Sequence, residues 1–490
     1  MSLLALLTSA ALLAAVVAAA LPEPARRRTS GSFSIWPLSI ATFIAAASVI
    51  RAAVGGGDLI GPLFALLVVA LTVVVQLYAE RNLRGDPRAR PFFAFSSLAA
   101  LGSASSVAAD DVRLLAAGWT VASISTVALI WTGGRSPQTR AATRRSALSL
   151  LLGDLALWTA AGIAITATGS ASLNSLGTLE PAPATAVSVL AAVAAVARAG
   201  SFPLHGWLPA TAATTTPVSA LLHAGFVNAG AVLLLRFAEV PTVAGPWVVG
   251  IAGAFTMVLA GLAMLTRPDV KGRLVQSTAA QMGFMLVACS LGAYGLALVH
   301  VMGHALYKAS LFLGAGSAVE RALAARTVEQ TTPSRRGGGT GAVVVALVAL
   351  AAIGAGGILS HQTAALLLFP LATAAVAGAK LGSSGASRVA RTATVAGVAA
   401  AAVGYVLLVF PAAESLVPTV PAAALPPAFA VALFAVAAFV AAATRTSGRL
   451  GDHLFAFGFA WGRPALPVLP TRTPSTPTVL TGPLEYGSTR

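Results

Sequence analysis

The chain has 490 residues, of which 57% are apolar and only 9% charged, and its mean hydropathy is +0.85. Repeated apolar runs of about 20 residues indicate membrane-spanning helices, so the composition excludes a soluble globular protein and predicts an all-α, polytopic membrane protein. The net charge of +16 does not indicate nucleic-acid binding, because the basic residues cluster in short loops between the apolar runs. The single cysteine, Cys289, excludes an intrachain disulfide framework and a cysteine-ligated zinc or iron–sulfur site.

The apolar runs predict about 14 or 15 transmembrane helices. The first run, residues 3–21, is interpreted as a retained helix rather than a signal peptide, because it lacks a basic leading region and three arginines, at 26–28, follow it. The predicted spans are 2–21, 34–54, 59–79, 91–109, 112–132, 147–168, 184–204, 216–237, 245–265, 274–291, 294–318, 341–358, 361–381, 392–410 and 425–444.

Basic residues are concentrated in alternate loops. Loops after odd-numbered spans carry arginine or lysine, for example Arg84, Arg144 and Lys271, whereas the loops 55–58 and 110–111 after even-numbered spans carry none. Because short cytoplasmic loops are enriched in Lys and Arg, this pattern predicts a cell-membrane protein with its N-terminus outside and its C-terminus in the cytoplasm.

We divide the chain into three regions. Residues 1–109 are expected to form N-terminal transmembrane helices, and residues 110–444 a conducting core with the C-terminal helices. Residues 445–490 are rich in Pro, Thr and Gly, which predicts a disordered cytoplasmic tail.

Two predicted spans contain helix-breaking residues. The stretch 200–217 has Pro203, Pro209 and Pro217, and the stretch 354–362 reads G-A-G-G-I-L-S-H-Q. Unpaired backbone groups at membrane depth are tolerated only where they line a protected or watery cavity. Two broken helices, one in each half, fit a transporter with inverted repeats, although the sequence shows no convincing internal repeat.

The chain has only three lysines, Lys271, Lys308 and Lys380, and Lys308 lies inside an apolar run. His300, His304 and Lys308 recur every four residues, which places them within about 80° on one helical face. Such a stripe of titratable groups can pass a proton through small local rearrangements. Single residues carry less weight, since His361 could be a structural core histidine, and Lys380 and His205 could reach the membrane interface.

Metal and haem sites are alternative interpretations of the histidines. His300 and His304 have the spacing of a zinc pair, but no glutamate follows His300 as in H-E-x-x-H and no third ligand is evident. A lysine one turn away on the same helix suits haem poorly. The chain has no Walker-type loop and no dinucleotide fingerprint, so we expect neither ATP-driven transport nor NADH chemistry in it, and no cofactor or metal.

Three motifs resemble one known family. They are A-R-A-G-S-F-P-L-H-G-W-L-P-A-T-A-A-T-T-T-P-V-S-A-L-L-H-A-G-F-V-N-A-G (197–230), D-V-K-G-R-L-V-Q-S-T-A-A-Q-M-G-F-M (269–285) and H-V-M-G-H-A-L-Y-K-A-S-L-F-L-G-A-G-S (300–317). They are similar to the proton-conducting antiporter-like family, which includes the NuoL-type subunits of respiratory complex I and the Mrp antiporters. The segments H-G-W-L-P and L-L-H-A-G-F-V-N-A-G look most like the DabB branch, the membrane subunit of an inorganic carbon transporter.

The resemblance implies a proton relay. In this sequence Lys271, His300, His304 and Lys308 match the family's central relay positions, His223 its eighth-helix histidine, and Asp154 the aspartate of a G-D motif. The full set of relay candidates is Lys308, His304, His300, His223, Lys271, Asp154, Arg198, His361 and Lys380.

The sequence also departs from the family. Arg198 stands where complex I homologues have a pump lysine, Thr120 where they have the paired glutamate, and His361 where they have lysine. An arginine cannot deprotonate in this role, so a complex-I-type pump stroke is not expected. The resemblance implies instead a membrane subunit that conducts H⁺ or Na⁺ to energise CO₂ or bicarbonate uptake, in a hetero-oligomer with a DabA-like peripheral zinc subunit. A complex I subunit L-like or Mrp-type antiporter subunit is the alternative.

Overall fold

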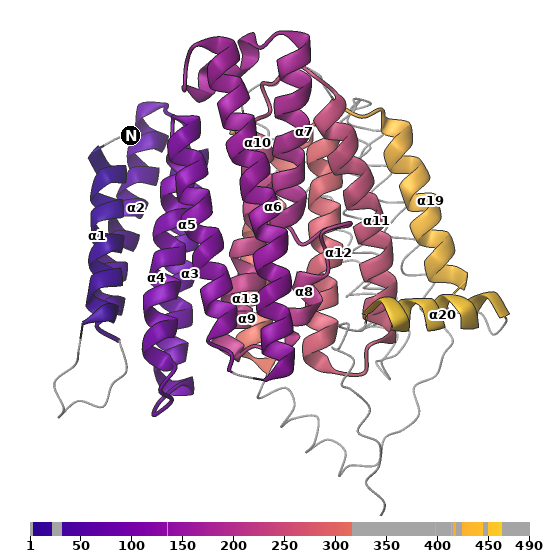
Figure 1. Ribbon diagram of the computed structural model, residues 1–490, viewed down its shortest axis with the longest axis horizontal. Coiled ribbons are helices and arrows are strands. Elements are labelled where there is room, and N and C mark those ends of the chain that lie inside the picture. Colours follow the sequence, from indigo (N-terminus) through magenta and orange to yellow (C-terminus); the bar gives the residue numbers. More distant parts are fainter. Residues whose placement is uncertain are drawn as a thin grey trace, which may run out of the picture.

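The computed structural model describes residues 3–21, 32–134, 136–315, 424–443 and 449–462, and the isolated positions 397, 413 and 415–417. These residues form a bundle whose long helices run roughly parallel to one another (Figure 1). The helices are α1 (Leu3–Ala20), α2 (Ile35–Gly55), α3 (Ile60–Asn82), α4 (Ala89–Val107), α5 (Val112–Trp131), α6 (Pro137–Thr168), α7 (Pro181–Arg198), α8 (Trp207–Ala210), α9 (Thr216–Ala224), α10 (Ala229–Arg236), α11 (Ala244–Thr266), α12 (Val270–Ser290), α13 (Tyr294–Leu313), α19 (Pro427–Ala443) and α20 (Arg449–Gly462).

The predicted all-α fold is confirmed. The predicted spans within the described residues fall on helices, with 216–237 divided between α9 and α10, and nine helical segments in this part of the chain are long and apolar enough to cross a membrane. The predicted spans 341–358, 361–381 and 392–410, and the second predicted break at 354–362, lie outside the described residues. α6 begins ten residues before the predicted span, because Ser136 caps its N-terminus and Pro137 occupies its first turn.

Small residues allow neighbouring helices to approach closely. A side chain at Gly102 of α4 would place its Cβ 2.6 Å from the Ala122 backbone nitrogen of α5, and one at Gly283 of α12 would place it 2.5 Å from the Met257 nitrogen of α11. Such contacts are typical of helices that associate in a membrane, where van der Waals packing rather than hydrophobicity drives association.

The loops gather at the two opposite ends of the bundle. At one end Arg88, which precedes α4, donates a hydrogen bond to the Gly133 carbonyl oxygen at 3.2 Å. At the other end Asp111 forms an isolated bridge with Ser172. We refer to these as the arginine-rich end and the arginine-poor end, since the alternate loops that carry most of the arginines meet at the first.

The first predicted break is confirmed. α7 ends at Arg198, Gly200 has a positive φ of 61°, and a cis peptide bond joins Phe202 and Pro203. A single turn, α8, then precedes α9. The next span is also interrupted, which the sequence analysis did not predict: α9 ends at Ala224, a 3-10 turn covers Phe226–Asn228, and α10 follows.

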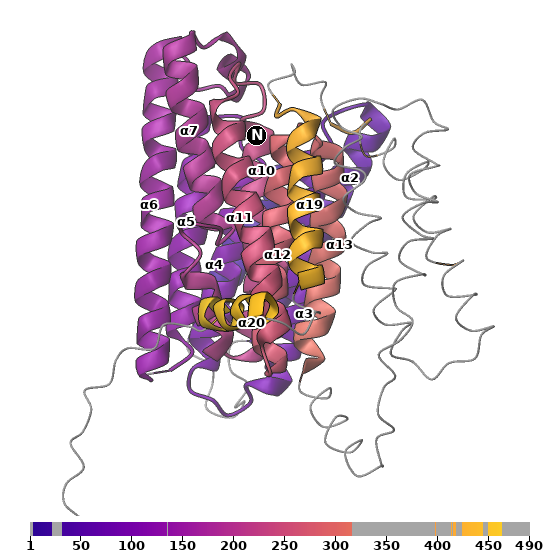
Figure 2. The ribbon, with the colours of Figure 1, turned by 90° about the vertical axis from the view of Figure 1, so that its right-hand side faces the viewer.

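The prediction of a disordered tail from residue 445 is wrong for Arg449–Gly462, which form α20. α20 lies across the bundle near its arginine-rich end and packs against α11 (Figures 1 and 2). Its glycines Gly451, Gly458 and Gly462 are buried, while Leu450, Phe455 and Phe457 are exposed. The segment is therefore an amphipathic helix, the type of helix that lies in a membrane interface.

Candidate functional site

The two interrupted helices place polar side chains at the centre of the bundle. Arg198 ends α7, His223 lies in the last turn of α9, and Asn228 lies in the turn between α9 and α10. α13 packs against α9 and α12 and brings His304 and Lys308 to the same region. All five side chains are buried, and Lys308 is 0% exposed.

Arg198 is held in place by α5, α6 and the turn after α9. Its Nη2 donates hydrogen bonds to the Trp119 carbonyl oxygen at 2.9 Å and to Ser123 Oγ at 2.8 Å. Its guanidinium lies 3.8 Å from the centre of the Trp119 ring and 4.2 Å from that of Phe226. These contacts hold the Arg198 side chain in one position, because a guanidinium stacks well on aromatic faces.

Asp154 of α6 supplies the negative charge nearest to Arg198. Asp154 Oδ1 lies 3.9 Å from Arg198 Nη2 and accepts a hydrogen bond from Ser123 Oγ at 2.7 Å. Thr120, which stands where relatives have a glutamate, turns away and accepts a hydrogen bond from Trp158 Nε1 at 3.0 Å. The acid that balances Arg198 therefore comes from α6 rather than from α5.

The α13 stripe faces the bundle interior. The rings of His300 and His304 stack with their centres 5.7 Å apart, and the His300 ring lies 5.0 Å from that of Phe284 on α12. Lys308 donates hydrogen bonds to the Ser277 hydroxyl and, at 3.5 Å, to the Leu274 carbonyl oxygen. Among the residues the structure describes, no carboxylate forms an ion pair with Lys308.

Asn228 sets the tautomer of His304. The Asn228 amide nitrogen donates to the Ala224 carbonyl oxygen at 2.6 Å, which turns its oxygen toward His304 Nδ1 at 3.0 Å. Because that oxygen can only accept, Nδ1 carries the hydrogen and Nε2 is left with a lone pair. The Nε2 atom is buried and has no hydrogen-bond partner within the described part of the chain. Its lone pair is therefore not used by any donor in the described residues.

His223 is oriented in the same manner. The Thr211 hydroxyl donates to the Leu208 carbonyl oxygen at 2.6 Å, so its oxygen accepts from His223 Nε2 at 3.1 Å. The opposite atom, Nδ1, is buried without a protein partner in the described residues. The ring stacks on Phe312 of α13, with the ring centres 4.7 Å apart. The lone pair of a second buried histidine is thus also available.

Lys271 lies at the arginine-rich end of the same polar chain. Its ammonium donates a hydrogen bond to the Thr214 carbonyl oxygen. The Thr214 hydroxyl bonds to the Thr211 carbonyl oxygen at 2.8 Å and to Ser219 Oγ at 3.0 Å. Backbone carbonyl oxygens and hydroxyl groups therefore lead from Lys271 toward the threonine that orients His223.

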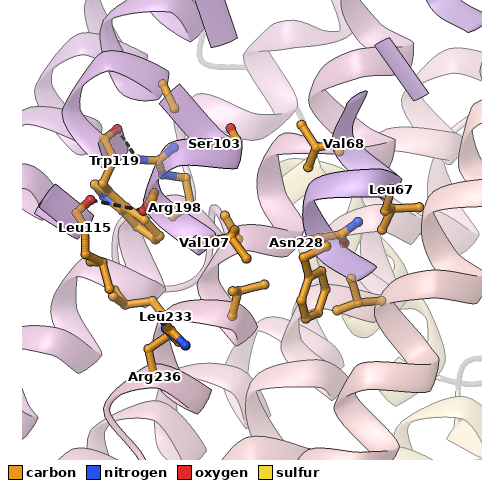
Figure 3. Close-up of a pocket in the computed structure, with 17 residues that line it drawn as sticks. Leu67, Val68, Ser103, Val107, Leu115, Trp119, Arg198, Asn228, Leu233 and Arg236 are labelled. Atoms are coloured by element: carbon orange, nitrogen blue, oxygen red, sulfur yellow. Dashed lines mark hydrogen bonds between the residues drawn. The ribbon is translucent and has the colours of Figure 1, made fainter. Parts of the chain in front are cut away.

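A narrow, mostly apolar cavity lies between the Arg198 cluster and the α13 stripe. Arg198, Asn228 and Arg236 lie at separate points around it, with Ser103 of α4 on another part of its wall (Figure 3). It has room for only a few water molecules. Arg198 lines the cavity directly, whereas the α13 stripe is one residue away from it, through the hydrogen bond between Asn228 and His304.

The structure thus sorts the predicted relay residues into groups. Lys271, His223, His300, His304 and Lys308 form one cluster on α9, α12 and α13, and Asp154 with Arg198 forms another. His361 and Lys380 lie outside the described residues. Within the described part of the chain, no group of three or more His, Cys, Asp or Glu residues is arranged to hold a metal ion.

Several residues of the site were missed by the sequence analysis. Ser123, Thr211 and Ser277 are uncharged, so a search for ionisable residues passes over them. Asn228 was available in the motif H-A-G-F-V-N-A-G, where an amide between two glycines in an apolar span is itself unusual.

The fold and this site define a multi-pass membrane protein with a buried chain of titratable side chains. Residues 109–379 match the family described as the transmembrane region of NADH:quinone oxidoreductase and Mrp antiporters. The chain belongs to this family.

Individual relatives refine the comparison. The probable inorganic carbon transporter subunit DabB1 of Halothiobacillus neapolitanus is 33% identical over 277 residues, which are 54% of this chain and 50% of the relative. The NADH-quinone oxidoreductase subunit L of Mycobacterium tuberculosis H37Rv is 30% identical over 273 residues, or 54% of this chain and 43% of the relative. This chain thus spans about half the length of these curated relatives. The predicted resemblance to the antiporter-like family and its DabB branch is confirmed.

A solved structure supports the fold. The Mrp complex from Dietzia sp. DQ12-45-1b contains a chain that superposes with a TM-score of 0.61 at 24% identity, covering 93% of this chain and 59% of that one. At this identity the likeness concerns the fold alone.

Proposed function

We propose that this chain is the ion-conducting membrane subunit of an inorganic carbon transporter. In this proposal protons, or alternatively Na⁺, move inward through the Lys–His cluster, and a DabA-like peripheral zinc subunit uses that flux to accumulate CO₂ or bicarbonate. The family membership and the similarity to DabB1 support this assignment. The arginine-rich end would face the cytoplasm, following the enrichment of Lys and Arg in cytoplasmic loops.

The observation that carries the proposal is the environment of Lys308. Its side chain is fully buried, and its hydrogen bonds go to a neutral hydroxyl and a neutral carbonyl oxygen. A charged lysine at this depth costs at least about 2.5–3.5 kcal/mol, and a desolvated lysine readily gives up its proton. A group that is costly to charge and able to deprotonate suits a proton carrier better than a structural anchor.

The neighbouring groups extend this site into a route. His304 Nε2 and His223 Nδ1 are buried without partners in the described residues, and Thr211 and Thr214 link His223 to Lys271 through their hydroxyl groups and backbone carbonyl oxygens. Asp154 and Arg198 are assigned a static role, because a guanidinium does not release its proton and this one is held by Asp154, Ser123 and the Trp119 carbonyl oxygen. His361 and Lys380 stay predictions from the sequence.

Growth of a carbonic-anhydrase-deficient bacterium in air tests the proposal. The chain produced together with its DabA-like partner should restore growth, whereas the chain alone should not. Lys308→Met should abolish rescue, and so should Lys308→Arg, because arginine retains the charge but cannot release a proton. Arg273→Met, at an exposed site near the same end, is the control and should rescue normally at an equal amount of membrane protein.

Two outcomes would contradict the proposal. Rescue by the chain alone would exclude the two-subunit assembly, and full rescue by Lys308→Met would exclude the relay. The similarity to subunit L and to the Mrp complex favours a complex I-like or Mrp-type subunit as the alternative. Purification of the native assembly separates these functions, since it would yield quinone-reductase or Mrp subunits in place of a zinc protein.

A further inference from the structure

Two cavities lie in series at the arginine-poor end of the bundle. The outer one, which we call the vestibule, lies among α1, α2, α3 and α4 and is lined by Thr8, Ser48, Arg51, Asp58 and Asp110. It is several times roomier than the inner cavity described above. The two cavities share two wall residues, Val107 of α4 and Arg236 at the end of α10.

Arg236 is held across this shared wall. Its Nη1 lies 3.7 Å from Asp58 Oδ2, and its Nη2 donates a hydrogen bond to the Ala109 carbonyl oxygen. Asp58 uses its other oxygen, Oδ1, to accept a hydrogen bond from the Ile60 backbone nitrogen at 2.9 Å. The ion pair thus ties the loop before α3 to the end of α10.

The pairing is weak enough to open. The Asp58 side chain is 55% exposed and that of Arg236 is 17% exposed, so water competes for both charges. Arg236 Nε is buried without a protein partner in the described residues, which leaves the guanidinium incompletely satisfied where it is. Rotation of this side chain into the vestibule would remove one of the two shared wall residues.

The inner cavity then leads to the relay. Asn228 lines it and accepts a hydrogen bond from His304 Nδ1, so the cavity ends one residue away from the α13 stripe. We propose that Arg236 and Asp58 form the outer gate of an aqueous entrance, through which water and the proton that it carries reach Asn228 and His304 from the arginine-poor end. The identity of the conducted ion as a proton rests on the proposed function. The existence of the entrance and its gate does not.

Thiol accessibility tests the gate without any assay of transport. Cys289 is the only cysteine and is buried, so Cys289→Ala gives a thiol-free background. Ser48→Cys then reports on the vestibule and Ala229→Cys on the inner cavity. Membrane vesicles are treated from one side with Ag⁺, and the unreacted thiol is measured with a fluorescent maleimide after denaturation in SDS.

We expect Ser48→Cys to react rapidly from one face of the membrane. From that face Ala229→Cys should be protected, and Arg236→Ala should speed its reaction up to about fivefold, the shift expected for the loss of a partly exposed ion pair. Asp58→Asn, a smaller change that leaves Arg236 in place, should also raise the rate. Arg51→Ala removes a vestibule arginine that is not in the shared wall and is the matched control, with no change expected.

Three results would overturn the gate. The first is an Ala229→Cys reaction rate that neither Arg236→Ala nor Asp58→Asn changes. The second is an equal acceleration of that reaction by the control Arg51→Ala. The third is a reaction of Ala229→Cys only from the membrane face opposite to the one from which Ser48→Cys reacts. If the thiol measurements confirm the gate but the chain does not support carbon uptake, only the proposed function is rejected. The failure of the gate and the failure of the proposed function are therefore distinguishable.

Discussion

Arg198 Nη2 and Asp154 Oδ1 lie 3.9 Å apart in the interior of the bundle, and the Ser123 hydroxyl is hydrogen-bonded to both side chains. The sequence contains no glutamate at Thr120 to balance the cation, and the structure supplies the balance from α6 instead. A buried charge without a partner is far costlier than a paired one. The cluster therefore joins α5, α6 and α7 at the point where α7 ends.

Asp154→Asn should destabilise the protein strongly. It leaves the buried Arg198 charge without its nearest acid, and breaking a buried pair in this way costs about 3–5 kcal/mol. The exposed pair Asp86–Arg88 provides the control, because Asp86→Asn should cost no more than about 1 kcal/mol. The measurement is the thermal unfolding midpoint in detergent. Equal midpoints for the two variants would show that the Arg198 charge is balanced in another way.

The double variant Asp154→Asn with Arg198→Met separates charge from packing. Removing both charges should restore part of the stability that Asp154→Asn loses, because neither uncompensated charge remains. A double variant less stable than Asp154→Asn alone would assign the main contribution to stacking between Arg198, Trp119 and Phe226.

The hydrogen bond between Asn228 and His304 gives a second prediction. Asn228→Leu leaves His304 Nδ1 without its acceptor, which should cost about 1–3 kcal/mol of stability and remove the preference for a free Nε2. Carbon-dependent growth should therefore fall even where the protein accumulates normally in the membrane. Ser103 lies on the wall of the same cavity and has no hydrogen bond to a relay residue in the part of the chain that the structure describes. Ser103→Ala should therefore leave growth unchanged, and a similar loss in both variants would point to the cavity rather than to the tautomer.

Much of the fold could be predicted, because membrane insertion imposes a strong local signal. Each long helix needs a run of apolar residues, and Pro203, Pro209 and Pro217 interrupt one run visibly. The stripe of His300, His304 and Lys308 also follows from helical periodicity alone. The long-range pairs do not, since Arg198 with Asp154 and Asn228 with His304 depend on which helix faces which. α20 was missed for another reason: Pro- and Thr-rich residues follow it, and their composition obscured a short amphipathic segment.

Asp111 gives a prediction for pH dependence. Its carboxylate caps α5 by accepting from the Arg113 backbone nitrogen at 2.7 Å and forms an ion pair with the Arg113 side chain. The hydrogen bond from that side chain lowers the pKa of Asp111 below its usual value. A carboxylate with a lower pKa in the folded state contributes stability above its unfolded pKa of about 3.9, and this is lost as the pH falls through the folded value.

Asp111→Asn isolates this contribution, because asparagine is also a good helix cap but carries no charge. The wild-type chain should unfold at a slightly higher temperature than the variant near neutral pH, and the difference should shrink as the pH falls below about 4. Thermal midpoints across this range, at low ionic strength, are the measurement. A difference that stays constant with pH would mean that the cap geometry, not the charge, stabilises this end of α5.

The contact between α20 and the break after α7 gives the last prediction. Trp461 stacks on His205 with their ring centres 4.4 Å apart and an interplanar angle of 9°, so α20 covers the histidine. A side chain at Gly458 would place its Cβ 2.7 Å from Leu262 Cγ of α11, whereas one at Gly261 would meet nothing within 4 Å. Gly458→Leu should therefore undock α20, and Gly261→Leu, on the partner helix, should not. His205 should then react faster with diethyl pyrocarbonate in Gly458→Leu and in Trp461→Ala, as measured by mass spectrometry of its peptide. Unchanged reactivity in both variants would show that α20 does not protect this segment.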